Sequence, residues 1–373
     1  MNSRRQFAAT GLAATASAAM ATKLYAPKCS ISYRKKTSTA AVLDISGYDA
    51  ALEERLLDGL RAFPLDVRGK RVLLKPNLVE ALPGPVNTDS TLVGAAARCF
   101  LRLGARSVVV GEGPGHQRDT EWVISAAHLP EQLSDKIRFV DLNRDEVRQV
   151  RLKAPYTGLG SLWLPVAVLS ADVVVSMPKI KTHHWAGVTL SLKNMFGIVP
   201  GQKYGWPKNL LHWHGIKESI LDICATAPIH FVIADGVIAM EGNGPLQGTA
   251  RALHKLVLAD DPVAADVTCA RLMGFDPAHI AEASRFLGNV NPSRIRQLSG
   301  WKPDRPFQVL PQFAHLVAED SLHVESLVLE LAAMLLRRHS IGAGSVTIPR
   351  SSCLTRSHAR RVLEYIGSST SCS

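Results

Sequence analysis

The sequence predicts an α/β protein with a mostly parallel, Rossmann-like layered sheet and helices on both faces. Short apolar runs alternate with amphipathic helical stretches from residue 39 onward, as in consecutive βαβ units. Polar and glycine-rich segments follow several of these runs, which is the pattern of an open α/β sheet. A chain of 373 residues can form one large domain or two smaller ones. We expect an α/β domain over residues 38–290, with lobes at about 38–150 and 151–290.

The expected strands of the first lobe are short apolar runs bounded by polar or turn residues. They cover residues 40–45, 71–74, 107–110 and 137–140. Apolar residues recur at helical spacing between these runs, which predicts helices over residues 48–63, 91–103 and 121–127. For the helix at 91–103, Ser90 is a plausible N-cap and Gly104 a stop.

The second lobe repeats this pattern. Strands are expected over residues 173–176, 231–234 and 253–258, and helices over 217–226 and 262–273. The region 197–213 has no periodicity and is rich in Gly, Pro, Trp and His, which indicates a functional loop or lid. Residues 291–373 are expected to form a C-terminal extension, with an apolar helix at 322–336 and a loose basic tail.

The first residues have the features of a twin-arginine export signal. Ser3-Arg4-Arg5-Gln6-Phe7 is followed by an Ala-rich segment and by the small-x-small site Ala19-Met20-Ala21. We therefore expect a cleaved signal peptide at residues 1–21, a linker at 22–37, and a periplasmic or extracellular protein that meets the twin-arginine translocase during export. No later stretch approaches the roughly 20 apolar residues of a membrane-spanning helix, so no stable membrane span is expected after cleavage.

Composition narrows the choice of partner. The net charge is +11, and a basic surface attracts anions, but no nucleic-acid motif accompanies the charge and we expect no nucleic-acid partner. The six cysteines lie far apart without a C-x-x-C pair, so no iron–sulfur cluster is expected from them. The expected partner is a small anionic ligand.

The densest group of polar residues lies at 177–197, directly after the apolar run 173–176. Three lysines, two adjacent histidines and an asparagine occur there, interrupted by Gly187 and Gly197. Ligands bind at the carboxyl ends of strands in open α/β sheets, so we expect a functional site in this segment and in the polar residues after other strands. The candidate substrate-binding residues are Lys75, Asn77, Lys179, Lys181, Asn194, Asp235 and Asn243.

Histidines supply the expected chemistry, because their pKa lies near neutral pH. His116 and His183 are the candidate acid/base groups, and Lys193 is a third candidate catalytic residue that would anchor a cofactor or an anionic group. The candidate ligands of a transition metal are His184, His212 and His214, of which the last two share one face if the segment is extended. The alternative is a non-catalytic anion- or metal-binding protein, in which the lysines hold a carboxylate or phosphate.

Three motifs resemble the family of conserved proteins named domain of unknown function 362. They are Lys75-Pro76-Asn77-Leu78, the segment 178–197, and Asp235-Gly236 with Glu241-Gly242-Asn243-Gly244-Pro245. The resemblance covers roughly residues 40–290 and implies no settled activity. Some members of that family carry a ferredoxin-like cluster module, whose cysteines this chain lacks.

A second resemblance is to nickel-pincer lactate racemases. Gly115-His116-Gln117-Arg118 is similar to one of their loops, and His183, Gly187 and Lys193 reproduce a second spacing. The resemblance implies that His116 and His183 exchange a proton with the substrate carbon and that Lys193 holds the cofactor. It implies nickel, or another transition metal, on His212 or His214, and an isomerase-like or redox-like reaction. Residues 188–192 replace the glycine-rich filling of those enzymes.

These candidates define a geometric expectation. Lys75, His116, His183, Lys193 and Asp235 should converge on one edge of the sheet, because each follows an apolar run. A helix from residue 186 onward would separate the side chains of His183 and Lys193 by about 15 Å. A shared site therefore requires the chain to bend near Gly187, and glycine permits such a bend.

Overall fold

In the computed structural model, the described residues are 38–82, 84–115, 119–280, 296–297 and 305–317. Ten strands among them form one sheet, ordered β12-β1-β11-β10-β7-β2-β3-β4, with β8 paired to β10 and β9 paired to β8. The strands are β1 (Thr39–Asp44), β2 (Arg71–Pro76), β3 (Ser107–Glu112), β4 (Ile137–Asp141), β7 (Val173–Met177), β8 (Lys179–His183), β9 (Gly187–Thr189), β10 (Phe231–Glu241), β11 (Thr249–Ala259) and β12 (Arg296–Gln297).

The sheet is mixed but mostly parallel, which confirms the predicted fold class. β4, β3, β2, β7 and β10 run parallel to one another in that order. β11 pairs antiparallel with both β10 and β1, and β9 pairs antiparallel with β8. Strands of both expected lobes meet directly where Leu74 of β2 faces Val175 of β7. The lobe boundary near residue 150 stays a prediction.

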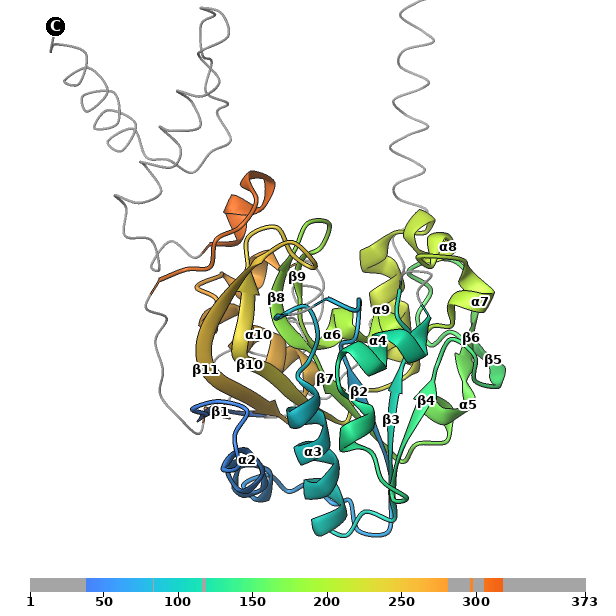
Figure 1. Cartoon of the computed structure of the whole chain (residues 1–373). Helices are drawn as coiled ribbons and strands as arrows, with labels where there is room; N and C mark the ends of the chain where they lie inside the picture. The colour runs from blue at the N-terminus through green and yellow to red at the C-terminus, as the bar shows by residue number, and fades with distance from the viewer. Residues whose placement is uncertain (1–37, 83, 116–118, 281–295, 298–304, 318–373) are drawn as a thin grey trace, which may run out of the picture.

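Helices cover both faces of the sheet (Figure 1). Side chains alternate along each strand, so that Val72 and Leu74 of β2 join one apolar cluster and Leu73 joins the other. The first cluster includes α2 and α3, and the second includes α9 and α10. The helices are α2 (Leu52–Arg61), α3 (Ser90–Arg102), α4 (Thr120–Ala126), α5 (Val166–Leu169), α6 (Ser191–Asn194), α7 (Gly201–Tyr204), α8 (Asn209–Trp213), α9 (Ile216–Thr226) and α10 (Pro262–Leu272).

Several predicted boundaries need correction. The N-cap of α3 is Asp89, whose carboxylate accepts a hydrogen bond from the Thr91 amide, whereas Ser90 is already the first helical residue. Gly104 does follow the end of this helix, with φ +94. The strand predicted at 231–234 continues to Glu241, so Asp235 lies inside β10 and not at its end.

The predicted functional segment 177–197 and the predicted loop 197–213 both consist of regular elements. Residues 177–197 contain the hairpin β8–β9, then α6 and the 3₁₀ helix η2 (Met195–Ile198). Residues 197–213 contain α7 and α8. An antiparallel pair, β5 (Val147–Arg151) and β6 (Ser161–Pro165), was not predicted. The other 3₁₀ helices among the described residues are η1 (Pro130–Gln132), η3 (Pro277–His279) and η5 (Pro311–Leu316).

Other expectations lie outside the described residues. These are the export signal and linker at 1–37, the helix at 322–336 and the basic tail. Within the described ranges, no helix has the length and apolar character needed to cross a membrane.

Candidate functional site

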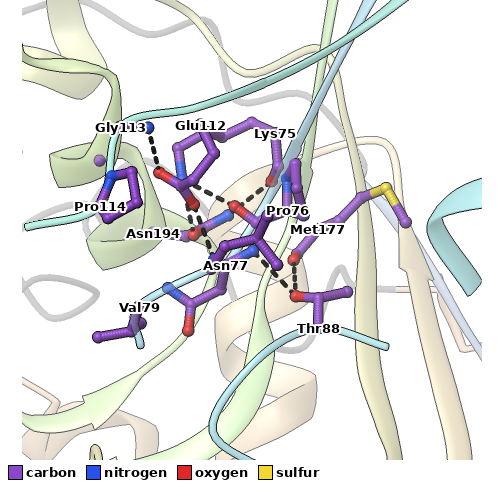
Figure 2. A network of polar contacts seen from close by, with 12 residues as sticks. Lys75, Pro76, Asn77, Val79, Thr88, Glu112, Gly113, Pro114, Met177 and Asn194 are labelled. Atoms are coloured by element: carbon purple, nitrogen blue, oxygen red, sulfur yellow. Dashed lines mark hydrogen bonds and ion pairs between the residues drawn. The ribbon is translucent and has the colours of Figure 1, made fainter. Parts of the chain in front are cut away.

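The carboxyl ends of β2 and β3 are joined by a buried ion pair (Figure 2). The Lys75 ammonium lies 2.7 Å from a carboxylate oxygen of Glu112, and the two side chains are 0% and 2% exposed. Lys75 also donates to the carbonyl of Pro76 at 2.8 Å and to Oδ1 of Asn194 at 3.2 Å. A lysine ammonium has three N–H donors, so Lys75 has an acceptor for each of them.

Asn194 connects this pair to the neighbouring strand and to α6. Its Nδ2 donates to the Lys75 carbonyl at 2.9 Å and to Oγ of Ser176, in β7, at 3.1 Å. Gly197 allows the close packing of the network, because a Cβ there would lie 2.5 Å from Oε1 of Glu112 and 2.6 Å from Nζ of Lys75. The structure therefore brings the predicted residues Lys75 and Asn194 into direct contact.

A second buried pair joins β8 to β10. The Lys179 ammonium lies 2.6 Å from Oδ2 of Asp235, and it also donates to the Tyr48 hydroxyl at 3.0 Å and to the Ile238 carbonyl at 3.1 Å. Tyr48 donates to the other carboxylate oxygen at 2.7 Å. Burial and the nearby Asp235 carboxylate raise the pKa of Tyr48, so it remains a donor. Lys179, like Lys75, has three acceptors.

Lys181 differs from both. It is 0% exposed, yet among the described residues its ammonium has one hydrogen-bond acceptor, the Val86 carbonyl at 2.5 Å, and no carboxylate at ion-pair distance. Its cross-strand neighbour Thr189 has a buried hydroxyl without a partner in the same part of the chain. Burial, then the charges of Lys193 and Lys179, lower the pKa of Lys181 well below its usual value.

His183 projects from the same face of β8 as Lys181, because alternate residues of a strand share a face. Its Nδ1 accepts hydrogen bonds from the amides of Trp185 at 3.0 Å and Ala186 at 3.2 Å. Burial, then Lys193 and the neighbouring histidines, lower its pKa. The ring is therefore neutral near pH 7 with its proton on Nε2, and this geometry favours a hydrogen-bond donor over a proton acceptor.

His212 has the opposite arrangement. Its Nδ1 lies 3.1 Å from the Lys208 carbonyl and must donate to it, which leaves the Nε2 lone pair available. The half-buried ring packs edge-on against Trp185 and Phe196, at centroid distances of 5.6 and 5.1 Å. Burial lowers its pKa, and Lys193 adds to this effect. Lys193 is half-buried and lies 6.0 Å from the centroid of the Phe196 ring.

The turn between β8 and β9 allows His183 and Lys193 to influence one another. The segment after residue 186 is a strand and a short helix, and Gly187 has φ +77. The charge of Lys193 lowers the pKa of Lys181, of His183 and of His212, and Lys181 and His212 also lower the pKa of His183. We call these four residues the basic cluster. It extends from the fully buried Lys181 to the half-buried Lys193 and His212.

Other predicted residues lie apart from this cluster or contribute less. Asn243 is exposed and bonds to Gln247, and His214 is exposed and bonds to the Thr157 carbonyl. His212 and His214 diverge because the segment is helical, not extended. Asn77 has a buried Oδ1 without a partner among the described residues. His116 lies outside the described residues.

The described residues include no group of three or more His, Cys, Asp or Glu placed to hold a metal. His184 and His212 each direct Nδ1 to a carbonyl, as metal-binding histidines do, but no third ligand joins them in this part of the chain. The described cysteines, Cys99, Cys224 and Cys269, are buried and separate. The assignment of His184, His212 and His214 as metal ligands therefore stays a prediction.

Sequence reasoning missed three residues of this region. Glu112 stands between two glycines after an apolar run, and this isolated charge was a usable signal. Asp266 accepts from Oγ and the amide of Ser191 at 2.6 and 2.7 Å and so fixes the start of α6. Lys208 is fully buried, and no pattern in the sequence indicated it.

Comparisons with known proteins define the family. The family model described as Domain of unknown function (DUF362) matches residues 72–271, more than half of the chain. The chain belongs to the DUF362 family. The thylakoid-associated protein sll1697 of Synechocystis sp. is 30% identical to this DUF362 protein over 237 residues, which cover 60% of this chain and 70% of that protein.

Two solved structures show a distant likeness to this DUF362 protein. The lactate racemase apoprotein from Thermoanaerobacterium thermosaccharolyticum has a TM-score of 0.42 and 15% identity, over 64% of this chain and 58% of that chain. A protein from Thermotoga maritima has a TM-score of 0.31 and 11% identity, over 54% of each chain. The DUF362 protein thus spans less than two thirds of either solved chain.

Proposed function

We propose that this DUF362 protein binds a small carboxylate or phosphate at the basic cluster, and that His212 exchanges a proton with the bound molecule. The observation that carries the proposal is the state of Lys181. A fully buried lysine has two N–H groups without an acceptor among the described residues, although its neighbours Lys75 and Lys179 each have three.

Burial of an ammonium is costly unless the group is paired and hydrogen-bonded. The carboxylates of Glu112 and Asp235 are already engaged by Lys75 and Lys179. A bound anion would supply both the missing acceptors and the missing negative charge. The hydroxyl of Thr189, which has no partner among the described residues and lies directly across from Lys181 in the hairpin, would donate to the same anion.

The rest of the cluster suits an anion as well. His183 presents Nε2–H because Nδ1 accepts two backbone amides, so it would donate to an oxygen of the ligand. Lys193 carries positive charge closer to solvent, where it would attract the anion. These donors would lie on one side of the bound molecule.

His212 is the proposed proton acceptor. Its Nδ1–H is fixed on the Lys208 carbonyl and its pKa is lowered, so Nε2 is unprotonated near neutral pH. A base with a pKa below the working pH is ready to accept a proton. Proton transfer at a carbon next to a carbonyl is the step shared by racemases and isomerases, and it is the reaction type proposed here.

Two measurements test binding and chemistry separately. Calorimetric titration with pyruvate and with inorganic phosphate should show binding of at least one of them, and binding should require Lys181. In D₂O, the protein should accelerate exchange of the C3 protons of pyruvate, and His212→Asn should lose this acceleration while it still binds.

The matched control is His214→Asn, which changes an exposed histidine two residues away. Binding without any exchange would identify the alternative, a non-catalytic anion-binding protein. Absence of binding by both anions would refute the proposed site.

A further inference from the structure

Lys208 occupies an unusual position next to the proposed base. It is a fully buried lysine outside the predicted site residues. Its backbone has φ +70 and ψ 45, in the left-handed region, directly before the first residue of α8. Residues other than glycine, asparagine and aspartate rarely adopt this conformation, so other contacts must hold it in place.

The side chain supplies those contacts. The Lys208 ammonium donates to the carbonyls of Gly113 at 2.9 Å, Phe196 at 3.2 Å and Gly197 at 3.3 Å. Three donors meet three acceptors, and the acceptors belong to the segment after β3 and to η2. Both segments also border the buried Lys75–Glu112 pair. The Gly113 amide donates to Glu112 at 2.8 Å, and Gly197 of η2 packs against both side chains of the pair. Lys208 is thereby anchored to the two segments beside this pair.

The backbone of Lys208 holds His212. Its carbonyl accepts from Nδ1 of His212 at 3.1 Å and from the amide of Leu211 at 3.0 Å. One residue therefore connects the buried network to the imidazole, with its side chain fixed at one end and its carbonyl aimed at the ring. Displacement of the ammonium would release the left-handed backbone and, with it, the acceptor that selects the Nδ1–H tautomer of His212.

We propose that Lys208 is a positioning residue for His212, which fixes the orientation and tautomer of the ring by anchoring α8 to the carbonyls of Gly113, Phe196 and Gly197. This inference rests on the proposed function, which assigns His212 its role as proton acceptor. It can still be tested alone, because the state of the ring is measurable without any ligand.

The experiment compares Lys208→Met with the control Lys203→Met, which removes an exposed lysine five residues earlier. The readout is ¹⁵N NMR of the histidine rings as a function of pH, with His212 assigned by loss of its signals in His212→Asn. In Lys208→Met we expect signal from the Nε2–H tautomer and a further fall of the His212 pKa, because the hydrogen bond to the Lys208 carbonyl raises this pKa more than the charge of Lys208 lowers it. The acceleration of pyruvate C3 proton exchange should fall at least tenfold while phosphate and pyruvate still bind, whereas Lys203→Met should match the wild type.

Each outcome decides the inference. A folded Lys208→Met with unchanged His212 tautomer and pKa would overturn it. If this variant does not fold, Lys208→Gln, which keeps an uncharged donor, takes its place in the same measurements. Failure of both to fold by circular dichroism would mean a purely structural role and would also overturn it. If the wild type binds neither anion, the proposed function fails, while the NMR comparison still decides the role of Lys208.

Discussion

Replacement of Lys181 by methionine should stabilise the ligand-free protein and abolish anion binding. Methionine has a similar length and no charge, and Lys181 leaves no carboxylate behind, because none lies at ion-pair distance in the described part of the chain. Replacing a buried ion pair with apolar residues of similar volume is often neutral or stabilising by about 1–4 kcal/mol, and a buried ammonium without a paired carboxylate has less to offset its desolvation than such a pair. We expect Lys181→Met to raise the free energy of unfolding at pH 7 by an amount in this range.

The gain should depend on pH in a defined direction. The pKa of Lys181 is lowered in the folded state from the ordinary value of 10.5. Between the two pKa values the unfolded chain binds a proton that the native state does not, so wild-type stability rises with pH in this window. Lys181→Met lacks that contribution. The excess of its free energy of unfolding over that of the wild type should therefore be largest below the pKa that Lys181 has in the folded state. This difference should shrink as the pH approaches 10.5.

Urea unfolding at several pH values, with and without phosphate, measures both effects. At 100 times its dissociation constant, phosphate should stabilise the wild type by about 2.7 kcal/mol and leave Lys181→Met unchanged. Lys70→Met is the charge-matched control, since Lys70 pairs with Asp66 at 2.9 Å on the partly exposed amino side of β2. It should change stability by less than about 1 kcal/mol. A destabilised Lys181→Met, or one that binds phosphate normally, would refute the reasoning.

Two further predictions concern the packing of the site and the N-terminus. Gly197→Ala should destabilise the protein by about 1–3 kcal/mol, because the new Cβ would lie 2.5 Å from Oε1 of Glu112. Urea denaturation measures this loss, with Gly115→Ala as the control, since a Cβ at Gly115 meets nothing within 4 Å. Equal stabilities of the two variants would contradict the prediction. Replacing Arg4 and Arg5 with lysine should retain the protein in the cytoplasm, as cell fractionation would show, and unchanged export would remove the basis of the proposed twin-arginine route.

The sequence was sufficient for the parallel strands and insufficient for the hairpin that carries the site. Apolar runs such as 173–176 predict buried strands because few other elements bury so short a run. The next strand, β8, has no such run: its basic residues Lys179, Lys181 and His183 alternate with Ile180 and Thr182. The polar character of these residues hid the strand, because the partners that allow their burial, such as Asp235 and Tyr48, come from distant parts of the sequence.

The same difficulty applies to the roles of individual histidines. The sequence identified His183 and His212 as candidates, but it could not indicate which ring nitrogen of each is engaged. That assignment comes from the amides of Trp185 and Ala186 and from the Lys208 carbonyl. Lys208 itself was beyond sequence reasoning, since its importance depends on three backbone carbonyls, which no residue type encodes.

The buried lysines at this edge of the sheet differ in the groups that accept hydrogen bonds from their ammonium groups and balance their positive charge. Lys75 and Lys179 have carboxylates, and Lys208 has three carbonyls and a pKa that burial lowers to about 7. In the described part of the chain Lys181 has one carbonyl acceptor, and burial and the charges of other lysines lower its pKa. A water molecule would supply acceptors to its remaining N–H groups but no charge, and a cation would be repelled. A carboxylate or phosphate supplies both acceptors and charge, and it would favour the protonated lysine as it binds.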